Sequence, residues 1–160
     1  MAVSTAYVNQ ILPKDAARVA IPGHVIQVVD ASSSTQISVT SGTPTSAGFN
    51  LTITPTFSNS KLIVQGVLAG EAMSAGGTDY GFRYQLYRNG SSVYDALYDI
   101  YMSSNNNQRI QKVPILFTQI ANTTSALTFE VYFNVTGSSS QARLNYYGAP
   151  SKLVIMEIAQ

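Results

Sequence analysis

The sequence predicts an all-β body, built as an antiparallel two-sheet sandwich or a barrel and preceded by an extended N-terminal arm. Short apolar, β-branched segments recur with a period of about two from His24 onward, and Gly-, Pro-, Asn- and Ser-rich turn clusters separate them. No segment of the body shows helical periodicity. About nine to eleven strands at regular spacing are typical of a sandwich or a barrel. We therefore divide the chain into an arm, residues 1–21, and a β domain, residues 22–160.

The arm differs in character from the rest of the chain. Pro13 interrupts its one stretch of helical pattern, and the single turn that residues 15–19 could form is too short to be stable alone. Pro22-Gly23 then separates the arm from the body. Because a segment of this kind cannot fold by itself, its apolar side chains are expected to need another surface. The residues concerned are Tyr7, Ile11 and Leu12, beside the charged Lys14 and Arg18.

The first half of the body is expected to contain four strands. A short apolar run comes first, two alternating segments follow, and a longer β-branched segment ends the series. Turn clusters are expected at residues 41–48 and 55–60, and a glycine-bearing loop at 72–78. The expected strands are residues 25–29, 37–39, 49–54 and 61–70.

A central hairpin is the strongest local prediction. Residues 80–88 and 91–102 flank Asn89-Gly90, a pair that favours a two-residue type I′ turn. In that register Leu86 faces Val93, Tyr84 faces Asp95, and Phe82 faces Leu97. The core face then holds Phe82, Leu86, Val93 and Leu97. The opposite face holds Arg83, Gln85, Tyr87, Tyr94 and Tyr98, and Tyr with Arg on an open face indicates subunit packing or carbohydrate stacking.

The second half of the body is expected to hold four more strands. Pro114 places its strand at a sheet edge or a bulge, because proline has no N–H to donate to a central ladder. Residues 137–141 are expected to form a flexible turn. The expected strands are residues 109–119, 126–136, 142–147 and 152–159.

The composition excludes several function classes. Charged residues make up 11% of the chain and the net charge is +1, so there is no basic surface to neutralise the phosphates of a nucleic acid. Ser, Thr and Asn supply 43 of 160 residues, which leaves little charge repulsion against subunit packing. Apolar runs are far shorter than a membrane span, and residues 1–22 do not resemble a signal peptide. We expect no membrane partner.

No cofactor, metal or catalytic site is expected. There is no cysteine, and His24 is the sole histidine, so neither a thiolate site nor a histidine pair can form. Asp79, Asp95 and Asp99 lie near the central hairpin, but their spacing fits no calcium loop and hydrogen-bonded carboxylates are the simpler reading. The dispersed acidic residues give no evident catalytic pair. We expect that the protein is not an enzyme.

The body resembles a β-sandwich module of phage virion proteins, found in tail-fibre tips and capsid decoration proteins. The matching segments are PGHVIQVV at 22–29, ITPTFSNSKLIV at 53–64, FRYQLYRNG at 82–90, NTTSALTFEVY at 122–132 and KLVIMEIAQ at 152–160. The resemblance covers roughly residues 22–160 and leaves the arm outside. It implies a jelly-roll-like sandwich that associates as a homotrimer and has no catalytic residues.

Two functions follow from this resemblance. The first is a trimeric decoration, or cement, protein on the capsid surface, which the absence of a fibre shaft before the module favours. Its partner is then the major capsid protein, to which Tyr7, Ile11 and Leu12 anchor the arm while Lys14 and Arg18 pair with acidic groups. The alternative is a tail-fibre or receptor-binding tip that recognises a host glycan. In either case Arg83, Tyr87, Tyr94 and Tyr98 are the expected subunit interface or glycan face.

Overall fold

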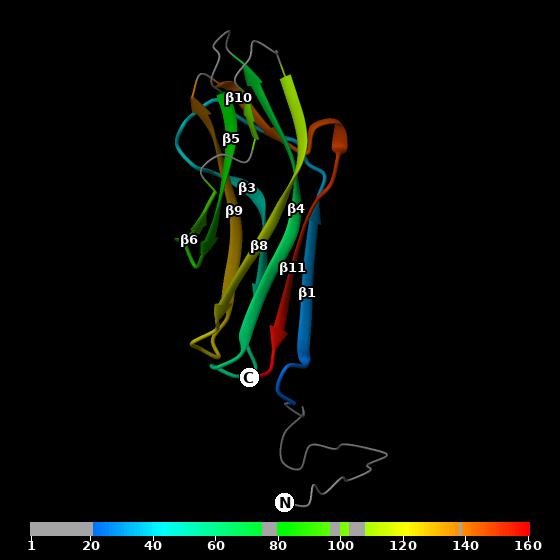
Figure 1. Cartoon of the computed structure of the whole chain (residues 1–160), viewed down its shortest axis with the longest axis vertical. Coiled ribbons are helices and arrows are strands. Elements are labelled where there is room, and N and C mark those ends of the chain that lie inside the picture. The colour runs from blue at the N-terminus through cyan, green and yellow to red at the C-terminus, as the bar shows by residue number, and fades with distance from the viewer. Residues whose placement is uncertain (1–20, 75–79, 97–99, 103–107, 138) are drawn as a thin grey trace, which may run out of the picture.

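The computed structural model is a sandwich of two antiparallel sheets (Figure 1). It describes residues 21–74, 80–96, 100–102, 108–137 and 139–160, so the arm prediction lies outside the described residues. Sheet A contains β1 (Val25–Ser33), β2 (Ile37–Val39), β4 (Lys61–Ser74), β8 (Gln108–Ile120), β10 (Ser139–Leu144) and β11 (Ser151–Ile158). Sheet B contains β3 (Thr45–Ile53), β5 (Tyr80–Arg88), β6 (Ser91–Asp95), β7 (Ile100–Met102) and β9 (Leu127–Gly137).

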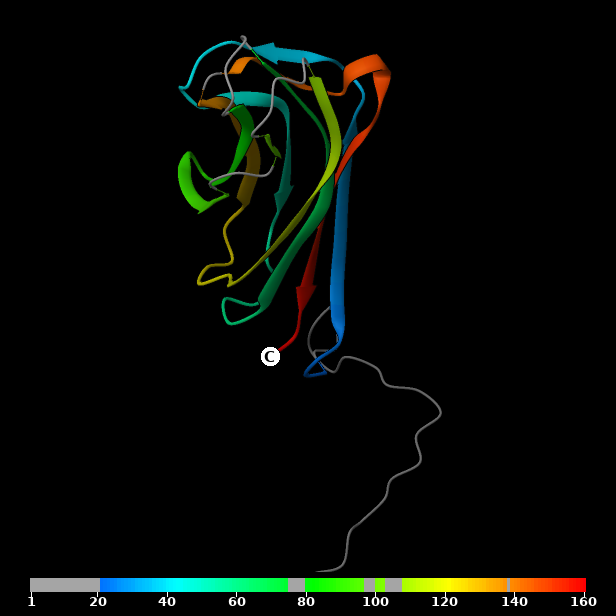
Figure 2. The same cartoon turned by 45° about the horizontal axis from the view of Figure 1, so that its top comes forward.

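The strand pairing is that of a jelly roll. The first strand pairs with the last, β1 with β11, and the next pairs nest inside it: β3 with β9, β4 with β8, and β5 with β6 and β7. The chain is thus one long antiparallel hairpin rolled into two layers, with β1, β11, β4 and β8 in one and β3, β9 and β5 in the other (Figures 1 and 2). The short β2 and β10 extend sheet A. The predicted two-sheet sandwich is confirmed.

The core lies between the two sheets and follows from period-two alternation. In β9, Phe129, Val131 and Phe133 are buried, while Thr128, Glu130 and Tyr132 between and before them are partly exposed. The Phe82 ring contacts that of Phe133, with centroids 5.7 Å apart. Sheet A contributes the opposite layer with the buried side chains of Leu62, Val64, Leu153 and Ile155.

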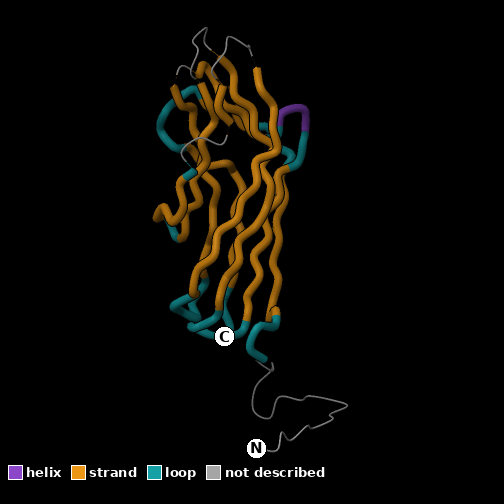
Figure 3. The backbone as a smooth tube through the Cα atoms, viewed as in Figure 1, coloured by secondary structure: helices purple, strands orange, loops and turns teal. Residues whose placement is uncertain are grey.

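Most strands lie where the sequence predicts them, but three turn predictions are wrong in part. β3 begins at Thr45, inside the expected 41–48 turn. β4 continues to Ser74, into the expected 72–78 loop, because β10 and β8 both pair with its upper end. For the same reason the expected flexible turn at 137–141 contains the start of β10. The chain then leaves the sheet through a single 3-10 turn, η1 (Tyr146–Gly148), shown in purple in Figure 3.

The central hairpin has the predicted turn but a different register beyond it. Asn89 and Gly90 both have positive φ, and Arg88 pairs with Ser91 as expected. A β-bulge at Val93 then pairs Leu86 with Tyr94 and Gln85 with Asp95. Since the side-chain period is two, the extra residue moves every later side chain to the other face. The predicted pairs of Leu86 with Val93 and Tyr84 with Asp95 are therefore wrong.

The core prediction for this hairpin is partly confirmed. Phe82 and Leu86 are fully buried. Val93 at the bulge is half-buried and packs against the core, and Leu97 lies outside the described residues.

Pro114 confirms its predicted edge position. β8 pairs only with β4 among the described strands, so one of its edges is open. The missing N–H of a proline interrupts such an edge and hinders unwanted strand pairing. The Pro114 carbonyl accepts a hydrogen bond from the hydroxyl of Tyr84 at 3.2 Å, which ties this edge to sheet B.

A buried carboxylate closes the sandwich near the two chain ends. Glu157 is fully buried, and its Oε1 accepts hydrogen bonds from the backbone N–H groups of Thr56, at 2.7 Å, and Phe57, at 3.2 Å. Burial by itself raises the pKa of this carboxyl, but the hydrogen bonds that it accepts from Gln27, Phe57 and Thr56 favour the charged form, and the pKa lies below its ordinary value of 4.5. These hydrogen bonds hold residues 54–60 against β11 of sheet A.

Candidate functional site

The predicted Tyr–Arg face lies on the outer side of sheet B. Arg83, Gln85 and Tyr87 alternate there along β5, opposite the buried Phe82, Tyr84 and Leu86. Tyr87 stacks on Tyr132 of β9 with ring centroids 4.2 Å apart. Negative charge on Glu130 raises the pKa of the neighbouring Tyr132 hydroxyl. This part of the prediction has the expected geometry, while its role stays a prediction.

The bulge removes Tyr94 from that face and places Asp95 on it. The Tyr94 ring lies beside those of Tyr84, at 5.7 Å, and Phe117, at 6.3 Å, so it packs at the open margin of the core. Asp95 instead pairs with Arg83, whose Nε donates to Oδ1 at 2.7 Å. The Arg83 hydrogen bond holds the pKa of Asp95 below its ordinary value. The predicted grouping of Tyr94 with Arg83 and Tyr87 is wrong.

Several predicted site residues lie outside the described residues. These are Tyr98 and the arm residues Tyr7, Ile11, Leu12, Lys14 and Arg18. The same holds for Asp79 and Asp99 of the considered cation cluster. In the part of the chain that the structure describes, no three His, Cys, Asp or Glu side chains gather as a metal site, and no helix is long and apolar enough to cross a membrane.

The outer side of sheet A is a candidate site that sequence reasoning missed. Side chains from β1, β11, β4 and β8 form cross-strand rows there; one row joins Val28, Met156, Ile63 and Thr118. An antiparallel sheet with one solvated face normally carries polar residues on that face, as sheet B does with Asn50, Thr52, Gln85 and Glu130. The outer side of sheet A instead carries many apolar residues. The apolar members of its outer side, here called the apolar face, are Val25, Val28, Ile63, Val67, Pro114, Leu116, Ile120, Val154, Met156 and Ile158.

Exposure is concentrated on this side of the molecule. Of the seven large hydrophobic side chains that are exposed among the described residues, five lie on the outer side of sheet A: Val25, Val28, Ile110, Leu116 and Ile120. Leu116 is 67% exposed and Val28 is 55% exposed. Single exposed hydrophobic residues are ordinary, whereas a contiguous group marks an interaction surface.

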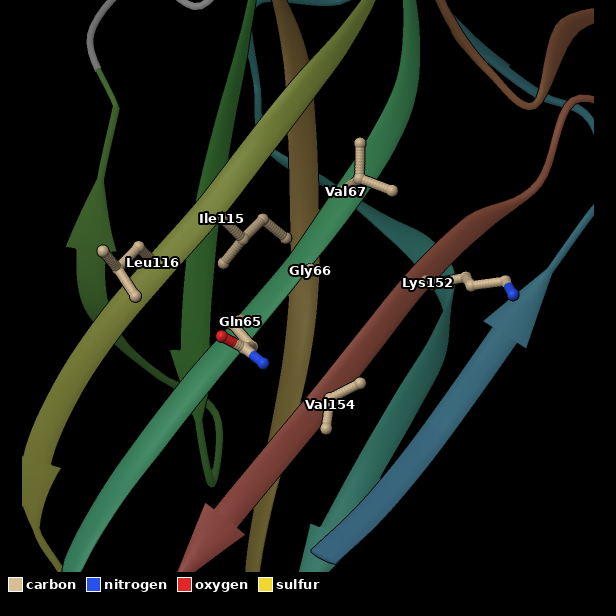
Figure 4. A pocket seen from close by; sticks show the side chains of 7 residues that line it. All are labelled: Gln65, Gly66, Val67, Ile115, Leu116, Lys152 and Val154. Carbon is tan, nitrogen blue, oxygen red and sulfur yellow. The ribbon is translucent and has the colours of Figure 1, made fainter.

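The apolar face contains a shallow depression of about 460 Å³ (Figure 4). Leu116, Gln65 and Val154 stand on three neighbouring strands around it, and Gly66 forms part of its lining. Gly66 is required there by close packing, because a Cβ at this position would lie 2.2 Å from the carbonyl oxygen of Lys152.

Charge surrounds the apolar face rather than crossing it. Lys61 lies in the row nearest the chain ends, and Lys152 and Lys112 lie toward the other end. Asp30 occupies the edge strand β1. Interfaces in general exclude charge from their centre and keep it at the rim, so this distribution fits a surface that packs against protein.

Comparisons with known proteins give distant structural likenesses. No family model and no curated protein matches this chain. Among solved structures, the VP2 subviral particle of infectious bursal disease virus matches with a TM-score of 0.46 and 16% identity, over 97% of this chain and 42% of that one. The chain thus spans less than half the length of that capsid chain.

Two further structures are bacterial. Latent PorU from Porphyromonas gingivalis matches with a TM-score of 0.42 and 13% identity, over 91% of this chain and 14% of that one. A disulfide-linked pilus of Bacillus endospores matches with a TM-score of 0.29 and 12% identity, over 91% of this chain and 99% of that one. Likeness at this level assigns no function, since sandwich folds serve many functions.

Proposed function

We propose that this protein is a structural protein of a phage virion, a homotrimer that decorates the capsid surface and stabilises the head. The apolar face of sheet A carries the proposal. Side chains such as Leu116 and Val28 gain about 1.5–3 kcal/mol each when they pass from water to a fully buried site. In a monomer these side chains stay exposed to water, so this stabilisation is not obtained. The site has no evident catalytic constellation, and the low charge of the chain opposes subunit packing little.

In this proposal the apolar face of each subunit packs against a second copy of the chain. Its open apolar centre suits burial in a subunit interface, and its lysines lie where solvent reaches the rim. The outer side of sheet B is a poorer interface centre, because it carries the Arg83–Asp95 ion pair, which is already formed within the subunit. We therefore place the proposed subunit contact on the apolar face of sheet A, and not on the tyrosines of sheet B that the sequence predicts as a subunit interface or glycan face.

Capsid attachment is assigned to the arm, as the sequence suggests. The body begins beside its own C-terminus, where the Gly23 N–H donates to the Ala159 carbonyl at 2.9 Å. The arm joins the body at this end. Tyr7, Ile11 and Leu12 are the proposed apolar anchors on the major capsid protein, and Lys14 and Arg18 the proposed partners of its acidic groups. Deleting residues 1–21 should leave the oligomer intact and abolish its binding to capsids that lack this protein.

Sedimentation of the purified full-length chain tests the subunit contact. We expect one species near three times 17.2 kDa at micromolar concentration. Leu116→Lys places a charge at the most exposed large hydrophobic residue of the apolar face and should give monomers. Asn50→Lys adds the same charge to an exposed strand position of sheet B and should leave the trimer intact. A monomeric wild type, or a Leu116→Lys variant that still sediments as a trimer, would refute the contact.

A tail-fibre tip that holds a host glycan is the second candidate. The stacked Tyr87 and Tyr132 favour it, because an aromatic pair on an open sheet face can also receive a sugar. Labelled antibody against the protein, viewed on intact virions by electron microscopy, separates the two functions. Label on heads supports decoration, and label on tail tips supports the second candidate.

A further inference from the structure

A second aromatic feature stands on η1, at the end of the sandwich opposite Ile21 and the C-terminus. Ser33 pairs with Ser151 at this end of sheet A, whereas Val25 pairs with Ile158 at the other. Tyr147 is 85% exposed, more than any other large hydrophobic side chain among the described residues. Its ring lies 4.0 Å from that of Tyr146. We name this pair the tyrosine ledge.

The ledge rests on a buried ion pair. Glu71 is fully buried in β4, and Arg143 of β10 binds its carboxylate with Nε and Nη2, the latter at 2.8 Å. The Arg143 guanidinium lies 3.8 Å from the centre of the Tyr146 ring, which in turn supports Tyr147. Each group in this series fixes the next, so the outermost ring is held in place rather than free to rotate.

The backbone of the ledge is strained. Asn145, Tyr147 and Gly148 all have positive φ, and for a residue as bulky as Tyr147, at φ 54°, this is rare. Asn145 holds the turn: its Nδ2 donates to the Thr35 carbonyl at 2.9 Å, and its Oδ1 accepts from the Ser151 hydroxyl at 2.6 Å. Strain maintained by a buried network at an exposed residue is typical of a functional position.

The surroundings of the ledge are polar but carry little free charge. Thr35, bonded to Asn145, lies beside the exposed Ser34 and Gln36, which offer hydroxyl and amide groups. Arg143 is neutralised by Glu71. The ammonium of Lys112 donates to the Pro150 carbonyl at 3.0 Å. Lys112 and Lys152 also separate the ledge from the apolar face, so the two surfaces are distinct.

We propose that the tyrosine ledge is a binding site for a neutral pyranose sugar. The apolar C–H face of a pyranose ring carries slight positive charge and stacks on the electron-rich face of an exposed tyrosine. Hydroxyl and amide groups around the ring then bind its hydroxyls. A nucleic-acid base could stack in the same way, but its phosphate would need free cations beside the ledge. A rigid, pre-formed ring reduces the entropy that binding costs.

Saturation-transfer NMR with the methyl pyranosides of glucose, galactose and N-acetylglucosamine at millimolar concentration tests the site. We expect a response from at least one sugar in the wild type and in Tyr147→Phe. Affinity should fall about tenfold or more in Tyr147→Ala, as when a base loses its aromatic stacking partner. His24→Ala, which removes an exposed ring at the opposite end of sheet A, is the control and should retain binding.

The ledge proposal is overturned by any of three results. These are no response to any of the sugars, an undiminished response in Tyr147→Ala, and a response that His24→Ala abolishes. Circular dichroism of each variant verifies its fold, which an 85% exposed side chain leaves intact. Sedimentation of the same samples keeps this outcome separate from the subunit contact, because sugar binding at the ledge does not require the trimer.

Discussion

Replacing Tyr147 by alanine and by glycine isolates the strain in the ledge. Both substitutions remove the ring and its contact with Tyr146, an interaction worth about 0.5–1.5 kcal/mol. They differ in the backbone, because alanine keeps the Cβ that makes φ 54° unfavourable and glycine does not. The difference between the two variants therefore measures the cost of a Cβ at this φ, reduced by the extra chain entropy that glycine loses on folding.

We predict the sign of the difference in the free energy of unfolding between these two variants. A left-handed residue with a Cβ costs about 1–2 kcal/mol, so Tyr147→Gly should be more stable than Tyr147→Ala by about that amount. In regular secondary structure glycine is instead less stable than alanine by about 0.5–1 kcal/mol. The exposed Thr52 in β3, away from the proposed subunit contact, is the control position, where Thr52→Gly should be less stable than Thr52→Ala.

Urea unfolding followed by circular dichroism, at one protein concentration for all variants, measures both pairs. Equal concentration matters because subunit association adds to apparent stability. In thermal unfolding the difference at position 147 corresponds to about 2–8 °C for a chain of this size. If glycine at 147 is no more stable than alanine, the ledge is not strained and the argument for a functional position there fails.

Three further predictions concern the body. Phe82→Ala, in the centre of the core, should lower the free energy of unfolding by about 3–5 kcal/mol in urea titrations, and Tyr94→Ala at the open margin clearly less; the reverse order would show that the bulge is misplaced. Gly66→Ala should destabilise by at least about 1–3 kcal/mol because its Cβ meets a backbone oxygen, whereas Gly42→Ala, whose Cβ would lie 3.9 Å from its nearest neighbour, should be tolerated in the same assay. Because folding lowers the pKa of Glu157, its stabilisation is complete above pH 4.5 and is lost as pH falls through the lower folded value. Glu157→Gln should therefore destabilise at neutral pH and approach the wild type in acid; a constant difference between pH 7 and pH 3 would contradict this assignment.

The strands were predictable from sequence because each carries its own signal. Alternation locates β3 and β9, Asn89-Gly90 locates the central turn, and Pro114 marks an edge. The rolled order of the strands depends on pairings between segments far apart, such as β1 with β11, which periodicity alone does not encode. The expectation of a jelly-roll-like strand order came from the resemblance to the phage virion module.

The wrong predictions arose where one inserted residue changes the sheet face of every side chain that follows it. Nothing in Ser91-Ser92-Val93 distinguishes a bulge from regular pairing, so the predicted register placed Tyr94 and Asp95 on the wrong faces. The tyrosine ledge was missed for a related reason. Tyr146 and Tyr147 read as the end of a strand, and only the pairing of β10 with β4 shows that the chain leaves the sheet before them.

The apolar face was also partly predictable from the amino-acid sequence. β11 reads Lys-Leu-Val-Ile-Met-Glu-Ile, and residues 62–64 of β4 are Leu-Ile-Val, so apolar residues occupy both faces of each strand. Such near-continuous runs are typical of strands that are covered on both sides. Here sheet B covers one side, and within the described residues nothing covers the other. The subunit contact proposed above would supply this second layer, which the described residues of one subunit do not provide.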